Sequence, residues 1–338
     1  MNFEQISFDF AKEEKKGKAL VPKDETWYDN DFLLQDRIQK IQQIIGKYGE
    51  ENFSISFSGG KDSTVLHHLI DMAIPGNKIP RVYANTGIEL NMIRDFVLEM
   101  QKEDDRIVVI KPSTPIKPML EREGYPFKSK GHSSTVENYQ RTGEKGIWVK
   151  NYLKEGPGGY SNAKSCPEIL RYQFTPDFKI KVSDKCCLRM KEEPLKKWQK
   201  EHGKKHQIIG ITRAEGGRRF TAKCLAWKSK TALNFQPLAP VSKEWEDWFI
   251  EEFDIKICDI YKPPYNFLRT GCKGCHFAIE LQKELDILEE FFPAERKQCE
   301  IIWKPVYEEY RRLGYRLRKS ENEQLEGQMS IYDFANAQ

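Results

Sequence analysis

The chain of 338 residues lacks several features that would assign it to a broad class of protein. It contains no run of about 18 apolar residues, so a membrane-spanning helix is excluded. Residues 1–5 show no basic stretch leading into an apolar core, so we expect no secretory signal. The net charge is only +4, so binding to nucleic acid would require a local basic patch rather than overall basicity.

The eight cysteines do not form a small disulfide scaffold, which favours a reducing, cytoplasmic location. Cys186 and Cys187 are adjacent, and Cys272 and Cys275 form a C-x-x-C turn that suits zinc or an iron–sulfur cluster. Zinc ribbons normally use two separated C-x-x-C turns, so the adjacent pair favours a [4Fe-4S] cluster. Zinc, and unligated or disulfide-bonded thiols, stay open as alternatives. Four other cysteines show no ligand spacing and are expected to be buried free thiols: Cys166, Cys224, Cys258 and Cys299.

A glycine-rich loop, Ser58-Gly59-Gly60-Lys61-Asp62-Ser63, joins a predicted strand at 53–57 to a predicted helix at 64–70. Two glycines allow a sharp turn that brings backbone N–H groups close to an anion, and the helix N-terminus adds unsatisfied donors. The spacing is not that of a Walker A loop. The pattern therefore predicts a different kind of phosphate-binding loop.

Predicted strands and helices alternate along much of the chain: helix 33–47, strand 53–57, helix 64–70, strand 81–85, helix 89–102, strand 107–110, helix 190–202 and strand 207–211. This alternation predicts an α/β fold with a parallel twisted sheet and flanking helices. Ligands of such sheets bind beyond the carboxyl ends of the strands. The glycine-rich loop, Asn85-Thr86-Gly87 and Thr212-Arg213 all fall at such ends.

The composition divides the chain into four predicted parts: a peripheral arm (1–30), a nucleotide-binding α/β domain (31–236), a mostly helical part with the C-x-x-C turn (237–318) and a tail (319–338). Residues 112–185 are rich in Pro, Gly, Ser and Lys, with only a weak helical pattern at 136–153. A long irregular segment inside a domain is usually functional. We interpret 112–185 as a substrate-facing insertion.

The glycine-rich loop resembles the PP-loop of the ATP pyrophosphatase superfamily, whose Rossmann-like members adenylate a substrate and release pyrophosphate. Segments 83–89, 210–219 and 237–248 resemble the phosphoadenylylsulfate (PAPS) reductase branch of that superfamily. The cysteine pattern is similar to the [4Fe-4S] site of assimilatory adenylylsulfate reductases. Together these resemblances span roughly residues 50–280 and imply an enzyme.

Two departures from the reductases stand out. Their C-terminal Glu-Cys-Gly-Leu-His segment, which carries the attacking cysteine, is missing; the last cysteine here is Cys299. Lys61-Asp62-Ser63, which those reductases tend to lose, is intact. An intact ATP loop beside a cluster resembles the DndC family of DNA phosphorothioation sulfurtransferases and, more remotely, tRNA thiolation enzymes. This implies an ATP-dependent sulfurtransferase whose candidate acceptor is DNA or RNA. A sulfonucleotide reductase and a non-catalytic iron–sulfur sensor or scaffold are the alternatives.

The resemblance also implies roles for individual residues. Lys61, Asp62 and Arg213 are the predicted catalytic residues, with Asp62 orienting the loop or holding Mg²⁺. The nucleotide, ATP, is expected to contact Ser58, Gly59, Gly60, Lys61, Asp62, Ser63, Asn85, Thr86 and Gly87. Arg213, Arg218 and Arg219 would clamp an anionic substrate, with solvated loop charges as the alternative. Cys186, Cys187, Cys272 and Cys275 would hold the cluster, in a catalytic or a purely structural role.

Weaker signals concern partners. An aromatic stripe on a predicted helix, from Trp303 to Leu317 with arginines between, is either a nucleic-acid face or a core-facing surface. The segment 328–334 resembles peptides that bind bacterial sliding clamps, with an apolar tail packed on the body as the alternative. His276 is a candidate neighbour of the cluster. A sulfur donor such as a cysteine desulfurase is the other expected partner.

Overall fold

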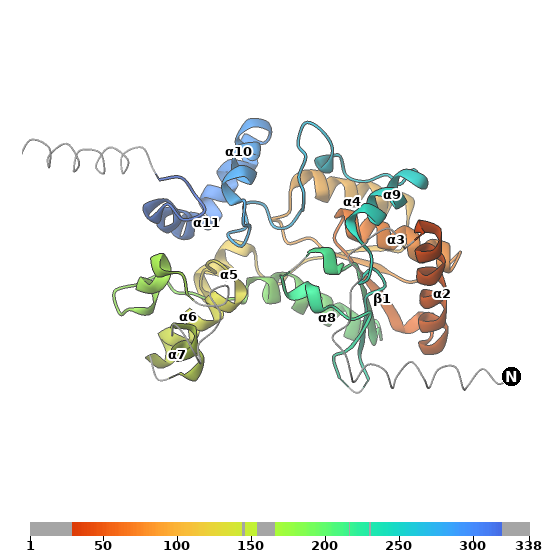
Figure 1. The fold of residues 1–338 in the computed structure, drawn as a ribbon, viewed down its shortest axis with the longest axis horizontal. Helices are drawn as coiled ribbons and strands as arrows, with labels where there is room; N and C mark the ends of the chain where they lie inside the picture. Colours follow the sequence, from red (N-terminus) through yellow and green to blue (C-terminus); the bar gives the residue numbers. More distant parts are fainter. Residues whose placement is uncertain (1–28, 144–145, 154–165, 216, 230, 320–338) are drawn as a thin grey trace, which may run out of the picture.

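The computed structural model describes residues 29–143, 146–153, 166–215, 217–229 and 231–319 (Figure 1). Six strands form one sheet in the order β3-β2-β1-β4-β6-β5. Their bounds are β1 Phe53–Phe57, β2 Arg81–Ala84, β3 Ile107–Ile110, β4 His206–Ile209, β5 Leu225–Trp227 and β6 Leu233–Phe235. All neighbours pair in parallel except β5 and β6. The predicted parallel α/β sheet is confirmed, with an antiparallel edge that the sequence pattern did not reveal.

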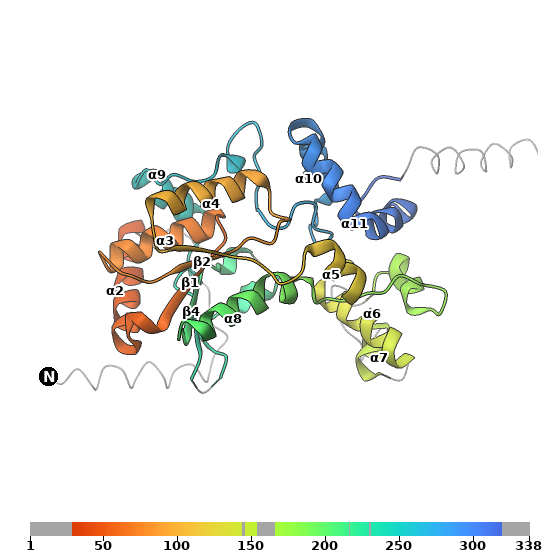
Figure 2. The ribbon, with the colours of Figure 1, turned by 180° about the vertical axis from the view of Figure 1, so that it is seen from behind.

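Helices cover both faces of the sheet. In Figure 2, α3 (Lys61–Ala73) and α4 (Asn91–Glu103) lie on one side of β1 and β2, and α8 (Glu193–Glu201) lies on the other. Helices α2 (Asn30–Tyr48) and α9 (Lys243–Glu252) pack on α3. Their apolar residues, including Leu34, Val65 and Phe249, form one core with β1, β4 and β6. The glycine-rich loop therefore leaves a strand that is packed on both sides.

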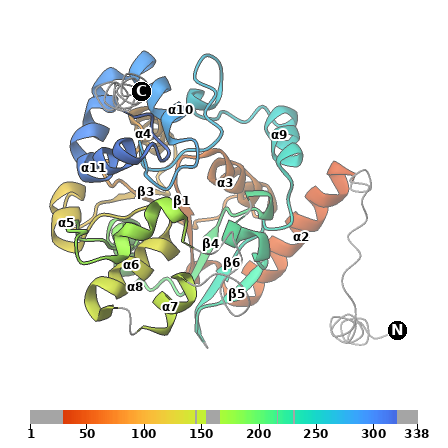
Figure 3. The same ribbon diagram turned by 60° about the vertical axis from the view of Figure 1, so that its left-hand side comes forward.

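The insertion forms more helix than its sequence suggested. It contains α5 (Ile116–Glu123), α6 (Lys130–Thr142), α7 (Ile147–Leu153) and a 3-10 segment (Glu168–Phe174). These elements lie next to the C-terminal helices α10 (Leu281–Phe291) and α11 (Pro293–Leu313), as Figures 1 and 3 show. Residues of the insertion, the C-terminal helices and α4 form a second core. Helix α4 thus contributes to this second core as well as flanking the sheet.

No helix in the described ranges combines the length and the apolar character needed to cross a bilayer.

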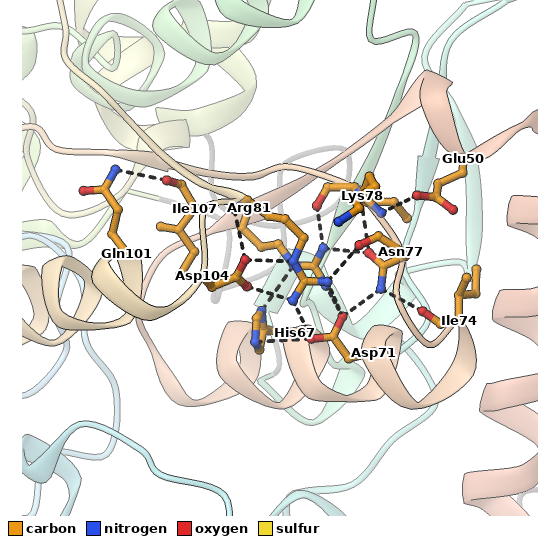
Figure 4. Close-up of polar contacts among 12 residues, drawn as sticks. Glu50, His67, Asp71, Ile74, Asn77, Lys78, Arg81, Gln101, Asp104 and Ile107 are labelled. Carbon is orange, nitrogen blue, oxygen red and sulfur yellow. Dashed lines mark hydrogen bonds and ion pairs between the residues drawn. The ribbon is translucent and has the colours of Figure 1, made fainter.

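A buried polar network anchors α3 to the amino ends of the strands (Figure 4). Arg81, the first residue of β2, is completely buried and donates to Asn77 Oδ1 at 2.7 Å and Asp71 Oδ1 at 2.5 Å. Arg106 donates to both carboxylate oxygens of Asp71 at 2.8 and 2.9 Å. Because removing one partner leaves a buried charge uncompensated, the network fixes the position of α3.

His67 takes part in this network as a neutral ring. Its Nδ1 accepts a hydrogen bond of 3.2 Å from Arg81 Nε, so the ring proton is on Nε2, 3.5 Å from Asp71 Oδ2. Burial lowers the pKa of His67 to about 4, and the positive charge of Arg81 acts in the same direction. The ordinary value in an unfolded chain is about 6.5. The stability contributed by neutral His67 is therefore present above pH 6.5 and is lost as the pH falls toward 4.

We predict that His67 makes unfolding strongly pH-dependent. Between pH 7 and pH 5 it should lower the free energy of unfolding by about 2 kcal/mol, because the folded state resists protonation of this ring. Urea unfolding across this range should show a smaller loss in His67→Gln than in the wild type. His202→Gln, at the exposed end of α8, is the control and should keep the wild-type slope. Equal slopes in all three proteins would contradict the assignment.

Candidate functional site

The glycine-rich loop has the backbone that the sequence predicted. Gly59 has φ +71°, and a Cβ there would collide with the side chain of Val97 on α4. Gly60 precedes the first turn of α3, and a Cβ on it would lie 3.1 Å from both Tyr261 Oη and Thr270 Oγ1. Two glycines are therefore required, one for the left-handed turn and one for the close approach of a distant segment.

The hydroxyl groups of Ser58 and Ser63 stabilise the loop itself. Ser58 N–H donates to Ser63 Oγ at 3.2 Å, and Gly60 N–H donates to Ser58 Oγ at 3.3 Å. Ser63 Oγ in turn donates to the Gly60 carbonyl at 2.8 Å. The loop is thus held in its shape by its own side chains.

Two side chains from the C-terminal half contact Lys61. Its backbone N–H donates to the hydroxyl of Tyr261 at 3.1 Å, and its ammonium forms an ion pair with Asp247 of α9. Burial acts most strongly and lowers the pKa of Lys61, but the hydrogen bond and the charge of Asp247 together with the charge of Glu246 and a hydrogen bond with Lys243 bring the pKa above its usual value. Lys61 is therefore positively charged and paired with Asp247.

A polar cavity of 130 Å³ opens at the loop. Its lining includes Lys61, Asp62, Arg219, Arg269 and Thr270. Burial lowers the pKa of the Arg219 guanidinium, as does the nearby positive charge of Arg269, while Asp62 acts in the opposite direction. Two guanidinium groups beside helix N–H donors form an environment suited to a phosphate.

The other two predicted anion-binding arginines are placed differently. Arg213 is exposed and donates from Nε to the Ala222 carbonyl at 2.8 Å. It is not among the residues lining the cavity at the loop. The side chain of Arg218 lies outside the described part of the structure. Arg269, which has no motif around it in the sequence, joins Arg219 at the loop instead.

A neighbouring cavity of 330 Å³ lies at the carboxyl ends of β2 and β3. Its lining includes the predicted nucleotide-binding residues Asn85, Thr86 and Gly87, together with Arg94 and Lys111. The side chain of Glu89 accepts from Thr86 N–H at 3.0 Å and from Thr86 Oγ1 at 2.5 Å. The strand-end segment is thereby fixed beside the glycine-rich loop, as the parallel sheet requires.

The two cysteine segments come together in the fold. Cys186 and Cys187 begin the helical segment that continues through a π-turn (Leu188–Glu192) into α8. Cys275 N–H donates to the Cys272 carbonyl at 3.1 Å, which closes the C-x-x-C turn. The hydrogen bond with Cys187 and burial raise the pKa of Cys186 most, and the charges of Cys187, Cys275 and Cys272 add to this effect.

All eight cysteines are free thiols, and the Sγ atoms of Cys186 and Cys187 are 4.0 Å apart. Within the described ranges, no three His, Cys, Asp or Glu side chains converge closely enough to hold a metal ion. A cubane cluster is larger than a single ion, so its four cysteine sulfurs lie further apart than those around a tetrahedral zinc. Four separated thiols from two segments match the donor set of such a cluster.

Lys191 connects the cysteines with the strand-end segment. Its pKa is raised above the usual value, mainly by the charge of Cys272 and then by that of Glu89. Its Nζ lies 3.6 Å from Glu89 Oε1, and Glu89 forms a β-bridge with Cys272. The carboxylate of Glu89 and the ammonium group of Lys191 therefore connect the cavity at the carboxyl ends of β2 and β3 with the thiols. Sequence reasoning missed Lys191, whose only signal was its position four residues after Cys187.

Side chains of helix α11 support the C-x-x-C turn by hydrogen bonds to its carbonyl groups. Trp303 Nε1 donates to the Lys273 carbonyl at 3.2 Å, and Tyr307 donates its hydroxyl proton to the Gly274 carbonyl. Tyr310 donates to the carbonyl of His276 at 3.4 Å. The aromatic side chains are at most 1% exposed. The stripe is thus a core-facing surface, and the alternative of a nucleic-acid face on this helix is wrong because no ring is available to stack on a base.

His276 is completely buried beside Cys275, as the cluster-neighbour interpretation requires. Its ring packs on Phe277 and Trp303, with centroid distances of 4.1 and 4.9 Å. Neither ring nitrogen has a hydrogen-bond partner among the described residues. The candidate clamp-binding segment 328–334 and residues 1–28 lie outside the described residues.

Residues 52–145 match the family model described as phosphoadenosine phosphosulfate reductase domain. A search of curated proteins returns no match. The family match confirms the predicted resemblance to the PAPS reductase family over this part of the chain, which is less than a third of its length.

Three similar solved structures illustrate the fold. PAPS reductase from Candida auris is 12% identical, with 68% of this chain and 88% of that chain covered and a TM-score of 0.40. FMN adenylyltransferase from Candida glabrata, in complex with ATP, is 13% identical, with 73% and 65% covered and a TM-score of 0.41. The U34-tRNA thiolase NcsA from Methanococcus maripaludis, with its [4Fe-4S] cluster, is 16% identical, with 85% and 82% covered and a TM-score of 0.35. Such distant neighbours assign neither substrate nor cofactor to this chain.

We predict that the C-x-x-C turn tolerates no Cβ at its glycine. Gly274 has φ +59°, and a Cβ would collide with Tyr307 and Cys299. Gly203 has φ +65° with open space around it, so Gly203→Ala isolates the backbone strain, about 1 kcal/mol. Gly274→Ala should lose about 2 kcal/mol more, because α11 must move. Urea unfolding of both variants measures the difference; equal losses would show that α11 does not support the turn.

Proposed function

We propose that this protein is an ATP-dependent, [4Fe-4S]-containing sulfurtransferase-like enzyme that adenylates its acceptor and releases pyrophosphate. One observation carries the proposal: a single segment, residues 261–275, contacts the intact ATP loop at one end and supplies two clustered thiols at the other. Tyr261 receives the N–H of Lys61, and Cys272 pairs with Glu89 beside the strand-end cavity. The proposed site of nucleotide activation is thereby connected by one short segment to the proposed site of sulfur chemistry.

The chain's own residues provide for the first step. Backbone donors of the loop and the guanidinium groups of Arg219 and Arg269 bind the phosphates. An acceptor oxygen attacks the α-phosphorus, the bond from that phosphorus to the β-bridging oxygen breaks, and pyrophosphate leaves with the electron pair. Lys61, released from Asp247, neutralises the charge that develops on the leaving group.

Mg²⁺ would have oxygen ligands at the same place. The carboxylate of Asp62 lines the cavity, and Glu246 of α9 is buried nearby with Oε1 lacking a partner among the described residues. Burial raises the pKa of Glu246 to about 8, and the charge of Asp62 adds to this effect. Mg²⁺ is usually held by one or two carboxylates with waters and phosphate oxygens, so this set is sufficient.

Cys186, Cys187, Cys272 and Cys275 would hold the [4Fe-4S] cluster. When bound, the cluster supplies iron that can bind sulfur or transfer electrons. Lys191 stabilises the negative charge of the thiolates, and α11 fixes the orientation of Cys272 and Cys275. These residues place sulfur chemistry beside the strand-end cavity, and a purely structural cluster is the alternative role.

The second step transfers sulfur. Hydrosulfide, released from the persulfide of a donor such as a cysteine desulfurase by two electrons from a thiol reductant, attacks the adenylated centre, and AMP leaves with the electron pair of the breaking bond. The acceptor is proposed to be DNA or RNA, whose oxygen is replaced by sulfur. Arg213 and Arg218, on the loop after β4, are the proposed contacts to its anionic backbone.

A sulfonucleotide reductase is the competing enzyme, and the family match favours it. It requires an accessible cysteine near the C-terminus to attack the sulfate sulfur. Cys299 is the last cysteine of the chain, is fully buried in α11 and packs under Gly274. Burial raises the pKa of its thiol to about 12. Its burial and raised pKa disfavour Cys299 as the attacking nucleophile, so the transferase is the better supported of the two enzymes.

We predict that Lys61→Ala lowers ATP–pyrophosphate exchange by about 10²- to 10³-fold, because one charge on the departing group is no longer neutralised. The assay is run with DNA and with tRNA as candidate acceptors. Lys256→Ala, which changes an exposed lysine away from the loop, should keep the wild-type rate. Unchanged exchange in Lys61→Ala would remove Lys61 from catalysis.

No exchange with any acceptor in the wild type would favour the non-catalytic scaffold, and sulfite release from PAPS with a thiol donor would favour the reductase.

We also predict about four irons and four sulfides per chain after anaerobic purification, as a [4Fe-4S] cluster contains. Cys272→Ser should lose the iron and the visible absorbance, because the cluster needs all four thiolates. Cys224→Ser, at a partly buried cysteine outside the site, should retain both. Stoichiometric zinc in place of iron would overturn the cluster and the proposed sulfur chemistry.

A further inference from the structure

A cavity beside the C-x-x-C turn is lined mostly by residues that have no role in the proposed nucleotide or cluster binding. It measures 450 Å³ and is formed by the loop 266–272, the C-x-x-C turn and the start of α10. Both Cys272 and Cys275 contribute to its wall. The volume falls within the roughly 300–1,000 Å³ of small-molecule sites. A substrate group can therefore enter next to the thiols.

The same loop separates this cavity from the one at the ATP loop. Leu268, Arg269 and Thr270 line both cavities. Thr270 is hydrogen-bonded to Tyr261, which receives the N–H of Lys61. A ligand in the 450 Å³ cavity would thus lie directly beside Cys272 and Cys275, and only this loop would separate it from the proposed phosphate site.

The walls combine apolar surfaces with hydrogen-bonding groups. Phe267, Phe277 and Ile287 contribute apolar surface, and Leu268 and Ile279 are 68% and 84% exposed. The carboxyl groups of Glu280 and Glu284 also line the cavity, as do the cations of Arg269 and Lys283. Two carboxyl groups disfavour an isolated phosphate inside. Flat apolar walls and carboxyl acceptors suit the face and the N–H edge of a heteroaromatic base, and the cations suit its flanking phosphates.

We propose that this cavity binds one unstacked nucleobase of the acceptor strand and thereby positions the strand between the ATP loop and the cysteines. The inference rests on the proposed function, because that function is the reason why a nucleic acid would bind to this protein. The group that the cavity recognises is the base itself, whether that base belongs to DNA or to RNA. Ile279, at the rim of the cavity, covers one face of the base, and Glu284 accepts from its edge.

The test measures binding of fluorescently labelled 12-nucleotide single strands to the full chain, purified anaerobically. Three probes are compared: DNA, RNA of the same sequence, and an abasic strand of equal length. At least one base-containing strand should bind, and the abasic strand should bind about tenfold more weakly, since stacking of a single base contributes on this scale. Whichever of DNA and RNA binds more tightly identifies the source of the base.

Ile279→Glu should weaken binding of the preferred strand about tenfold, because a charge at the rim opposes stacking. Ile147→Glu, on α7 and also exposed (68%), is the matched control and should bind like the wild type. Glu284→Gln should weaken binding less than Ile279→Glu, since an amide still accepts one hydrogen bond. Equal binding of abasic and base-containing strands, wild-type binding by Ile279→Glu, or no binding by any strand would each overturn the proposal.

ATP–pyrophosphate exchange measured on the same samples distinguishes this inference from the proposed function. Base-dependent binding without exchange would leave the base pocket standing and remove the adenylation step. Exchange with a strand that binds equally well without bases would keep the enzyme and remove the base pocket.

Discussion

The short antiparallel bridge between Glu89 and Cys272 connects the two halves of the protein, and the geometry of the site depends on it. Lys273 N–H donates to the Ile88 carbonyl at 2.7 Å, which extends the bridge by one residue. The Lys273 ammonium forms an almost fully buried ion pair of 2.9 Å with Glu295, whose carboxylate also receives the N–H of Asn91 at the start of α4. Removing one partner of such a pair typically costs about 3–5 kcal/mol, because the other charge stays buried. The bridge is therefore stiff, and it fixes the thiols relative to the strand ends.

This connection joins the two larger of the three hydrophobic cores found among the described residues. The first core lies between the sheet and helices α2, α3 and α9, and the second joins the insertion to α10 and α11. Helix α4 flanks the sheet and also supplies Ile93 and Phe96 to the second core. The cavity at the glycine-rich loop lies where these two bodies meet, because residues of the loop and of α3 line it together with Tyr261, which packs on the second core. Ligand sites commonly form at such boundaries, because neither core fills the space between them.

The glycine-rich loop is constrained from both ends of its helix. At the amino end, Gly59 and Gly60 admit Val97, Tyr261 and Thr270 to contact with the backbone. At the other end, the pairing of Arg81 with Asp71 holds α3 against the start of β2. The serine hydroxyls already satisfy the internal hydrogen bonds of the loop. A loop that is rigid before its ligand arrives loses little conformational entropy on binding, which is the general advantage of preorganisation.

Periodicity and spacing were enough to predict the features that depend on local chain geometry, namely the βαβ alternation and the loop at residues 58–63, and the sheet confirms the predicted fold. Spacing also suggested that the adjacent Cys-Cys and the C-x-x-C turn form one ligand set, which stays a prediction. The groups that each pattern contacts depend instead on how the folded chain packs. The stripe on α11 shows that one face is buried, but periodicity does not say that it is buried against the carbonyl groups of residues 273, 274 and 276. Tyr261, Lys191 and Arg269 stand in no motif, and they reach the site because residues far apart in the chain pack together. Asp247 lies 186 residues from Lys61, yet it holds that ammonium group. Such pairings depend on how two cores dock, which no local pattern encodes.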